Sequence, residues 1–204
     1  MAEDRRRYDS VRRTVQAQET RAEIARAARR LFVTRGWAAT TVRDVAREAG
    51  VSVPTVYAAY GSKTGLARAL ADSADLSADG PRLVAELEAT TEPSRQLAAM
   101  ASYDRRLFEQ AGEIIALARE AGRTEPELAD TYREARRRAD ETRLAVFSSW
   151  PPGVLRHEVL QMAVDVYAAI CNIDVYTTLT AERGWSPERV EQWWGAVLAR
   201  ELLR

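Results

Sequence analysis

The segment from Gly50 to Lys63 places the strongest constraint on how this chain folds. Its sequence is GVSVPTVYAAYGSK, and it follows a short amphipathic helix pattern over residues 41–49. Gly50 ends that helix, Ser52 is placed to cap the next one, and Pro54 falls in its first turn, where a missing amide hydrogen costs little. Two short helices joined by such a tight turn form the shape that fits the major groove of DNA.

Residues 20–36 carry the signals of a further helix. Thr20 and Glu23 have the spacing of a capping box, and Gly36 stops the pattern. Thr41 and Asp44 start the next helix in the same way. Three helices of this length bury a small core, and these residues are the expected contributors: Leu31, Phe32, Val45, Val56 and Tyr60.

Charge is distributed unevenly along a chain whose formal net charge is zero. Residues 1–70 carry 14 Arg and Lys against 7 Asp and Glu, whereas residues 71–204 carry 16 against 23. A basic front half is typical of a chain whose front touches a polyanion. Residues 1–19 are expected to form a flexible arm that reaches phosphates or a minor groove, or else a solvated terminus, and its arginines are Arg5, Arg6, Arg7, Arg12 and Arg13.

The rest of the chain reads as long helices, and no strand pattern is convincing, so we predict an all-α fold. Residues 79–81, 151–153 and 184–187 are breaks, and residues 124–127 have the spacing of another capping box. From about residue 156 to residue 182 the sequence is apolar on nearly every face, which indicates burial on more than one side. We expect a DNA-binding domain over 20–66 and a ligand-binding and dimerisation domain over 67–204.

Composition excludes several classes of protein. No apolar run approaches the ~18 residues of a membrane span, and the charged start lacks the apolar stretch of a signal peptide, so we expect a cytoplasmic protein without a membrane partner. Cys171 is the only cysteine and His157 the only histidine, which is too few for a disulfide, a zinc site or a supported Cys-His pair. We therefore expect no metal, no cofactor and no enzymatic activity.

The outer face of the third helix and the starts of its neighbours are the expected DNA contacts. Threonine can bond a base edge, tyrosine can donate to a phosphate, and a lysine at a helix start attracts phosphate. The candidates are Thr41, Arg43, Val53, Pro54, Thr55, Tyr57 and Lys63. Positions 58 and 59 are both alanine, so we expect few side chains able to reach base edges.

The segment resembles the tetracycline-repressor (TetR) family of one-component regulators. The resemblance covers roughly residues 20–70 and rests on Ile24, Ala27, Ala28, Leu31, Phe32, Gly36, Thr40, Thr41, Val42, Asp44, Val45, Ala46, Ala49, Gly50, Val51, Ser52, Thr55, Tyr57, Tyr60, Lys63 and Leu66. Residues 183–190, with Trp193 and Trp194, look like the last turn of many members. The resemblance implies an all-helical homodimer in which Tyr57 and Lys63 contact phosphates, Thr55 lies on the reading face and Tyr60 is a core aromatic.

The resemblance also implies a ligand pocket and a dimer interface after about residue 75. Pocket candidates combine aromatic walls with a few polar groups, although each could be plain core: Met100, Tyr103, Asp104, Leu107, Phe147, Trp150, Tyr167 and Cys171. Interface candidates are large apolar side chains, although the tryptophans could instead close the core of one chain: Tyr176, Trp193, Trp194 and Leu198.

The sequence thus favours a ligand-responsive, sequence-specific DNA-binding regulator. We expect a repressor that binds a near-palindromic double-stranded operator as a homodimer and is released by a small-molecule effector. The alternative is a helical carrier that sequesters small apolar molecules and retains a vestigial DNA-binding unit. An enzyme is the third reading, and no constellation of catalytic residues supports it.

Overall fold

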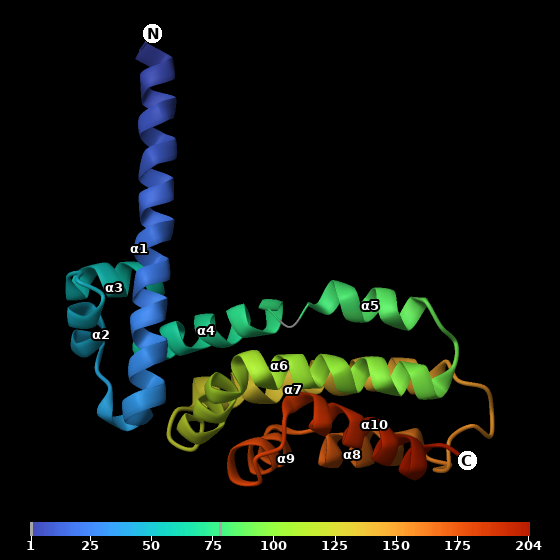
Figure 1. The fold of residues 1–204 in the computed structure, drawn as a ribbon. Helices are drawn as coiled ribbons and strands as arrows, with labels where there is room; N and C mark the ends of the chain where they lie inside the picture. The colour runs from blue at the N-terminus through green and yellow to red at the C-terminus, as the bar shows by residue number, and fades with distance from the viewer. Residues whose placement is uncertain (1, 78) are drawn as a thin grey trace. The chain divides into compact units, whose positions relative to one another are not determined.

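A computed structural model describes the backbone of residues 2–77 and 79–204 and the side chains of residues 14–73 and 79–204. These residues form helices joined by turns and loops (Figure 1), which confirms the all-α prediction. The chain divides into two compact units, Met1–Leu70 and Ala71–Arg204, so the division lies after residue 70 rather than after residue 66. Among the described residues, no helix is long and apolar enough to cross a membrane.

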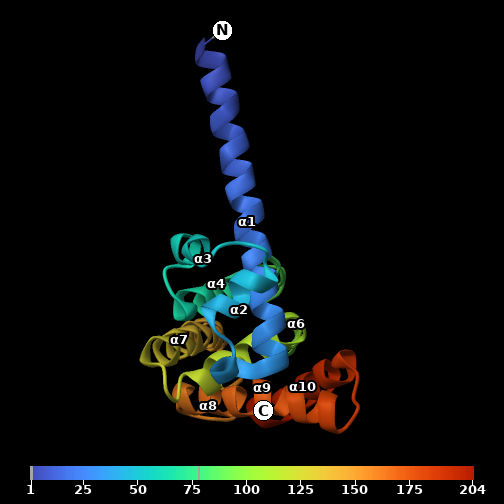
Figure 2. The same cartoon turned by 90° about the vertical axis from the view of Figure 1, so that its left-hand side faces the viewer.

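The first unit contains α1 (Ala2–Ala39), α2 (Val42–Glu48), α3 (Val53–Tyr60) and the start of α4 (Lys63–Ser77). The two views in Figure 1 and Figure 2 show α2 and α3 against the C-terminal half of α1. Their shared core contains four of the expected contributors, Leu31, Phe32, Val45 and Val56, which are buried. Tyr60 is only half-buried, because its hydroxyl reaches out to donate to the carbonyl of Arg21 at 2.9 Å.

Both predicted helix starts of the turn region are confirmed. At α2 the hydroxyl of Thr41 accepts a hydrogen bond from the amide of Asp44 at 3.1 Å, and the carboxylate of Asp44 accepts one from the amide of Thr41 at 3.1 Å. At α3 the hydroxyl of Ser52 accepts from the amide of Thr55 at 3.3 Å, with Pro54 in the first turn. Each cap satisfies an amide that the helix itself leaves without a partner.

Two other predicted capping boxes are wrong. Thr20 lies inside α1, where its hydroxyl donates to the carbonyl of Gln16 at 2.8 Å, so helix replaces the expected flexible arm from Ala2 onward. No glycine or proline interrupts residues 2–35, and nothing there stops the helix from continuing. At α7 (Pro126–Ser148) the preceding Thr124 donates to Ala121 at the end of the previous helix instead of capping the new one.

The second unit is built around α6 (Pro93–Ala121). It packs against α5 (Gly80–Glu88), α7, α9 (Ile173–Thr177) and α10 (Pro187–Leu202), while α8 (Leu160–Ile170) packs against α7 and α10. Figure 1 shows α6 with α7 and α10 alongside it. The core that these helices share includes large side chains from four of them: Leu97, Phe147, Tyr167 and Trp194.

The apolar stretch expected over residues 156–182 is divided at Cys171 and Asn172. Asn172 bridges the break, because its side-chain oxygen accepts from the amides of Asp174 and Val175 at 3.0 Å and its nitrogen donates to the carbonyl of Ala169 at 2.8 Å. The chain continues through α9 into a π-helical turn, Thr178–Glu182. Gly112 of α6 lets α9 approach closely, since a Cβ at that position would lie 2.9 Å from Cδ1 of Ile173.

We predict that Asn172→Ala lowers the free energy of unfolding by about 1 kcal/mol, because two amides of α9 lose their acceptor. Asn172→Asp keeps the acceptor and is expected to retain most of the stability. Urea unfolding followed by circular dichroism measures both variants. Equal losses in the two variants would contradict the capping role.

Candidate nucleic-acid interface and ligand cavity

The face of α3 that points away from α1 is small. Tyr57 is 50% exposed, and Pro54 and Ala58 are exposed beside it, while Val56 on the opposite side is buried. Val53 is half-buried at the start of the helix. Tyr57 is therefore the largest side chain that this face offers to another molecule.

Thr55 is partly committed to the cap of its own helix. Its hydroxyl lies 2.7 Å from the hydroxyl of Ser52, and the residue is half-buried. The side chain that was expected to read a base edge thus shares its hydrogen-bonding capacity with Ser52. This contact adds to the effect of the alanines at 58 and 59, and few donors or acceptors remain for direct reading of bases.

Lys63, the first residue of α4, has its charge held in place. Its ammonium group donates to the carbonyl of Trp37 at 2.5 Å and lies 4.0 Å from the centre of the Trp37 ring. Trp37 in turn packs on Phe32, with ring centres 5.3 Å apart. The positive charge is therefore fixed beside the last turn of α1, close to where α4 begins.

Arg21 is a contributor that sequence reasoning missed. Its guanidinium lies 4.6 Å from the centre of the Tyr60 ring and donates to the carbonyl of Ala59, while Tyr60 donates to the carbonyl of Arg21. Together these contacts tie the last turn of α3 to α1. An arginine 38 residues away in sequence gives no local signal of such a contact.

At the start of α2, Thr41 and Arg43 are both exposed. The hydroxyl of Thr41 donates to the carboxylate of Asp44 at 2.6 Å, and this hydrogen bond is the largest cause that holds the pKa of Asp44 below its usual value. Arg43 makes no ion pair with any described residue, so its charge is available to a phosphate. The arginines of residues 5–13 lie outside the described side chains.

The second unit contains a cavity of about 350 Å³ among α5, α6, α7 and α8. Its lining is mostly apolar with a few charged groups: Gly80, Leu83, Val84, Leu87, Met100, Tyr103, Asp104, Leu107, Ala135, Arg138, Ala139, Thr142, Arg143 and Tyr167. The structure brings five of the candidates to this cavity, namely Met100, Tyr103, Asp104, Leu107 and Tyr167.

Three of the predicted pocket residues do not line this cavity. Phe147, Trp150 and Cys171 are buried in the core instead. The ring of Trp150 packs 4.8 Å from that of Phe147, and its Nε1 donates to the side chain of Gln96 at 2.6 Å. Burial raises the pKa of the Cys171 thiol well above its usual value, which disfavours the reactive thiolate.

A buried ion pair lies at one side of the cavity. Oδ2 of Asp104 accepts hydrogen bonds from the hydroxyl of Tyr167 at 3.0 Å and from Nη2 of Arg143 at 3.2 Å. Nη1 of Arg143 donates to Asp140 at 2.7 Å, and its guanidinium lies 4.5 Å from the Tyr167 ring centre. Burial raises the pKa of Asp104 and Arg143 opposes this shift, while burial also raises the pKa of Tyr167.

Residues 24–70, which contain α2, α3 and the start of α4, match the family model described as "Bacterial regulatory proteins, tetR family". The first unit therefore carries a region of the tetR family. The HTH-type transcriptional regulator TtgR of Pseudomonas putida is 43% identical over 84 residues, which are 41% of this chain and 40% of that protein. The regulator AlkX of Mycobacterium tuberculosis is 43% identical over 65 residues, or 30% of this chain and 31% of that protein. The matched segments thus span well under half of these relatives.

Solved structures of low sequence identity share the fold of almost the whole chain. A putative transcriptional regulator from Saccharomonospora viridis in complex with choline has a TM-score of 0.74 at 22% identity, covering 92% of this chain and 99% of that one. NalD of Pseudomonas aeruginosa, described as the secondary repressor of the MexAB-OprM multidrug efflux pump, has a TM-score of 0.72 at 20% identity, covering 93% and 98%. The fold shared with these structures therefore extends through the second unit.

Three of the four interface candidates belong to the core of the chain itself. Trp194 is 0% exposed, and Leu198 and Tyr176 are buried around it, so the expectation that they face a partner is corrected. Adjacent positions on α10 point in different directions, and Trp193 is left 36% exposed with its ring edge-on to Trp185 at 6.0 Å. Of the four candidates, Trp193 alone keeps a surface that a partner can cover.

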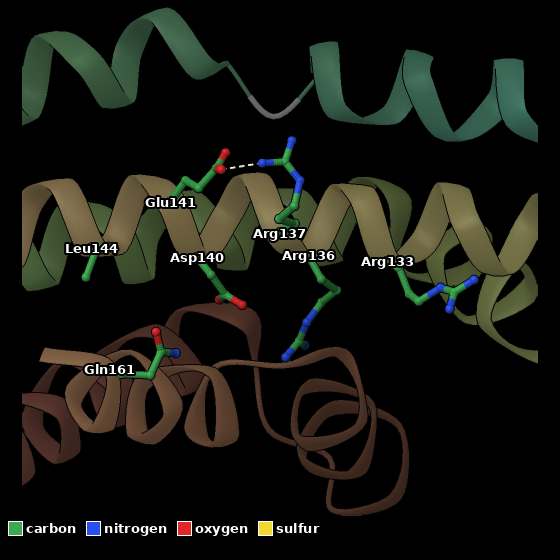
Figure 3. Close-up of a pocket in the computed structure, with 7 residues that line it drawn as sticks. All are labelled: Arg133, Arg136, Arg137, Asp140, Glu141, Leu144 and Gln161. Atoms are coloured by element: carbon green, nitrogen blue, oxygen red, sulfur yellow. Dashed lines mark hydrogen bonds and ion pairs between the residues drawn. The ribbon is translucent and has the colours of Figure 1, made fainter. Parts of the chain in front are cut away.

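A second, shallow hollow of about 440 Å³ lies on α7 beside Gln161 of α8 (Figure 3). Its charged side chains are largely paired within α7. Arg137 bonds Glu141 and Glu134, Arg138 also bonds Glu134, and these two arginines lower the pKa of Glu134 to about 2. Arg137 and Arg138 thus form part of an exposed face of α7 whose charges pair within the helix.

We predict that Arg143→Met lowers the free energy of unfolding by about 3–5 kcal/mol, because it leaves the buried carboxylate of Asp104 without its cation. The double variant Asp104→Leu/Arg143→Met is expected to lose less, since no buried charge remains. Arg133→Met, which breaks the exposed pair with Asp130, serves as the control and is expected to cost about 0–1 kcal/mol. Chemical denaturation measures all three, and a double variant less stable than Arg143→Met would contradict the role of the pair.

Proposed function

We propose that this chain is a transcriptional repressor that binds a near-palindromic operator as a homodimer and is released by a small molecule bound among α5–α8. The observation that carries the proposal is the pairing of an exposed Tyr57 with a positioned Lys63 on the helix-turn-helix that matches the family. The hydroxyl of Tyr57 can donate to one phosphate oxygen and the ammonium of Lys63 to another.

The proposed mode of binding relies more on phosphates and DNA shape than on base edges. Thr55 shares its hydroxyl with Ser52, and Ala58 carries no polar atom. Arg43 adds an exposed charge at the start of α2. We expect a strong salt dependence of binding with a modest preference for one sequence over another.

The proposed dimer joins two chains through α8 and α10. Val159 beside α8 is 64% exposed, Met162 on α8 is 51% exposed, and Trp193 on α10 is 36% exposed. Large exposed apolar side chains of this kind are typical of the centre of a protein interface. A twofold dimer would present two copies of α3 about 34–36 Å apart, one turn of DNA.

The proposed effector site is the cavity beside Asp104. Its mostly apolar walls and few polar groups are typical of small-molecule sites. Two structures with a similar fold, the regulator from Saccharomonospora viridis and SmeT, are described as complexes with choline and with triclosan. An effector would release DNA to the extent that it binds more tightly to the dimer arrangement that cannot bind DNA than to the arrangement that can.

A carrier of small apolar molecules is the second candidate, because the cavity alone would serve that function. A gel shift at low salt against the DNA upstream of the protein's own gene separates the two functions. A shifted band supports the repressor, and its absence supports the carrier.

We predict that Lys63→Ala weakens binding to every DNA sequence tested and reduces the magnitude of the slope of log K against log salt by about 1, because the protein then has one fewer cation in contact with phosphates. Tyr57→Phe removes a neutral donor, so it is expected to weaken binding with little change of slope. Arg133→Ala is the control, because this exposed arginine lies in the second unit and pairs with Asp130. Fluorescence anisotropy over a series of salt concentrations measures the slopes. An unchanged slope in Lys63→Ala, or an unchanged affinity in Tyr57→Phe, would count against the assigned phosphate contact.

We predict that Met162→Asp with Trp193→Asp converts the dimer into a monomer, because two carboxylates would be buried without partners. Val33→Asp is the control, since it places a carboxylate on an exposed apolar position of the first unit. Analytical ultracentrifugation gives the mass of each variant. A dimer of unchanged strength in the double variant would place the interface elsewhere.

A further inference from the structure

The carboxylate of Asp104 has one oxygen in use and one open to the cavity. Oδ2 accepts from Tyr167 and Arg143, whereas Oδ1 accepts no hydrogen bond from any described residue. Asp104 lines the cavity although the residue is only 5% exposed. Its Oδ1 has no hydrogen-bond partner among the described residues and is not fully enclosed by protein atoms. An ionised carboxylate has about four lone-pair sites, so Oδ1 has room for a donor that comes from a ligand.

The hydroxyl groups beside this carboxylate have their hydrogens committed. Tyr167 donates to Asp104, and the hydroxyl of Thr142 donates to the carbonyl of Arg138 one turn earlier in α7. These groups therefore give the cavity no free hydroxyl donor. On this side of the cavity Oδ1 of Asp104 is therefore a hydrogen-bond acceptor without a donor, and a ligand that supplies the donor would bind more tightly.

The charges around the cavity disfavour an ionised ligand. Arg143 pairs with the buried carboxylate of Asp104 and also with Asp140, whose side chain is 37% exposed, so the buried pair of Asp104 and Arg143 is already neutral. A ligand cation would meet Arg143 in the lining, whereas a ligand anion would face the open oxygen of Asp104. Arg138 also lines the cavity, but it is paired with Glu134. A neutral donor satisfies Oδ1 and adds no unpaired charge to a mostly apolar space.

We propose that this cavity selects small, neutral, mostly apolar molecules that carry one hydroxyl or N–H group, which donates a hydrogen bond to Oδ1 of Asp104. The inference rests on the proposed function only in treating the cavity as the effector site. A volume of about 350 Å³ lies near the small end of ligand sites, which span ~300–1,000 Å³, so the ligand is compact.

A naphthalene series tests the ligand class on the unmodified protein. Isothermal titration calorimetry compares 2-naphthol with 2-methoxynaphthalene, which has the same apolar body but no donor. It also compares the cation 2-naphthylmethylammonium and the anion 2-naphthoate. We expect 2-naphthol to bind about tenfold or more tightly than each of the others, the ratio typical of a hydrogen bond to a charged acceptor. Equal binding of the methyl ether, tighter binding of either ion, or no binding of 2-naphthol overturns the proposal.

A matched pair of variants assigns the selectivity to Asp104. In Asp104→Asn the amide oxygen remains towards Tyr167 and Arg143, so the NH₂ group faces the cavity and the preference for 2-naphthol over its methyl ether is expected to fall to about one. Asp140→Asn also removes a carboxylate from Arg143 but does not line the cavity, and the preference is expected to remain. A preference that survives in Asp104→Asn, or that is lost in Asp140→Asn, overturns the assignment. Thermal unfolding of both variants establishes that they are folded, and the unmodified protein tests the ligand class independently of them.

A DNA-binding assay with 2-naphthol keeps the two proposals separate. Selective binding of 2-naphthol with unchanged affinity for DNA supports the ligand class and refutes the effector role of the cavity. Absence of any DNA binding refutes the repressor and leaves the ligand class supported by the calorimetry. DNA binding without selectivity for 2-naphthol refutes the ligand class alone.

Discussion

The buried carboxylate of Asp104 is the interaction on which the second unit depends. One side chain of α6 accepts from Arg143 of α7 and from Tyr167 of α8, so a single charged oxygen joins three helices. A buried charge is stable only while its partners stay in place, and this fixes the relative positions of these helices more strictly than apolar packing alone. The same requirement leaves an oxygen facing the cavity, which links the stability of the bundle to the chemistry of the site.

In the first unit, α1 performs the corresponding role for the DNA-contacting elements. Arg21 holds the end of α3, and Trp37 holds Lys63 at the start of α4. Both contacts combine a hydrogen bond to a carbonyl group with a cation placed over an aromatic ring. The charge of Lys63, which the proposed function requires at a phosphate, is thus held in place before DNA arrives, and this lowers the cost of ordering it on binding.

Sequence patterns predicted what depends on neighbouring residues and failed where distant helices decide the outcome. The caps at Thr41 and Ser52 were predictable because their partners lie three residues away. The same spacing at Thr20 was misleading, because α1 continues through this residue and the backbone amides that follow it are bonded within the helix. The sequence named Asp104 of α6 as a pocket candidate, and this residue lines the cavity. Sequence patterns could not show which part of the interior is hollow, or that Trp194 turns into the core while Trp193 stays outside.

The place of Lys63 has a consequence for chemical labelling. Of the 30 basic residues in the chain, 29 are arginine, and Lys63 is the one side-chain amine. A reagent selective for lysine therefore reports on a single side chain, which rests against Trp37. An isotope label or fluorophore attached there marks the junction between α3 and α4 without mutagenesis, so the chain carries its own spectroscopic handle at the position assigned to the phosphates.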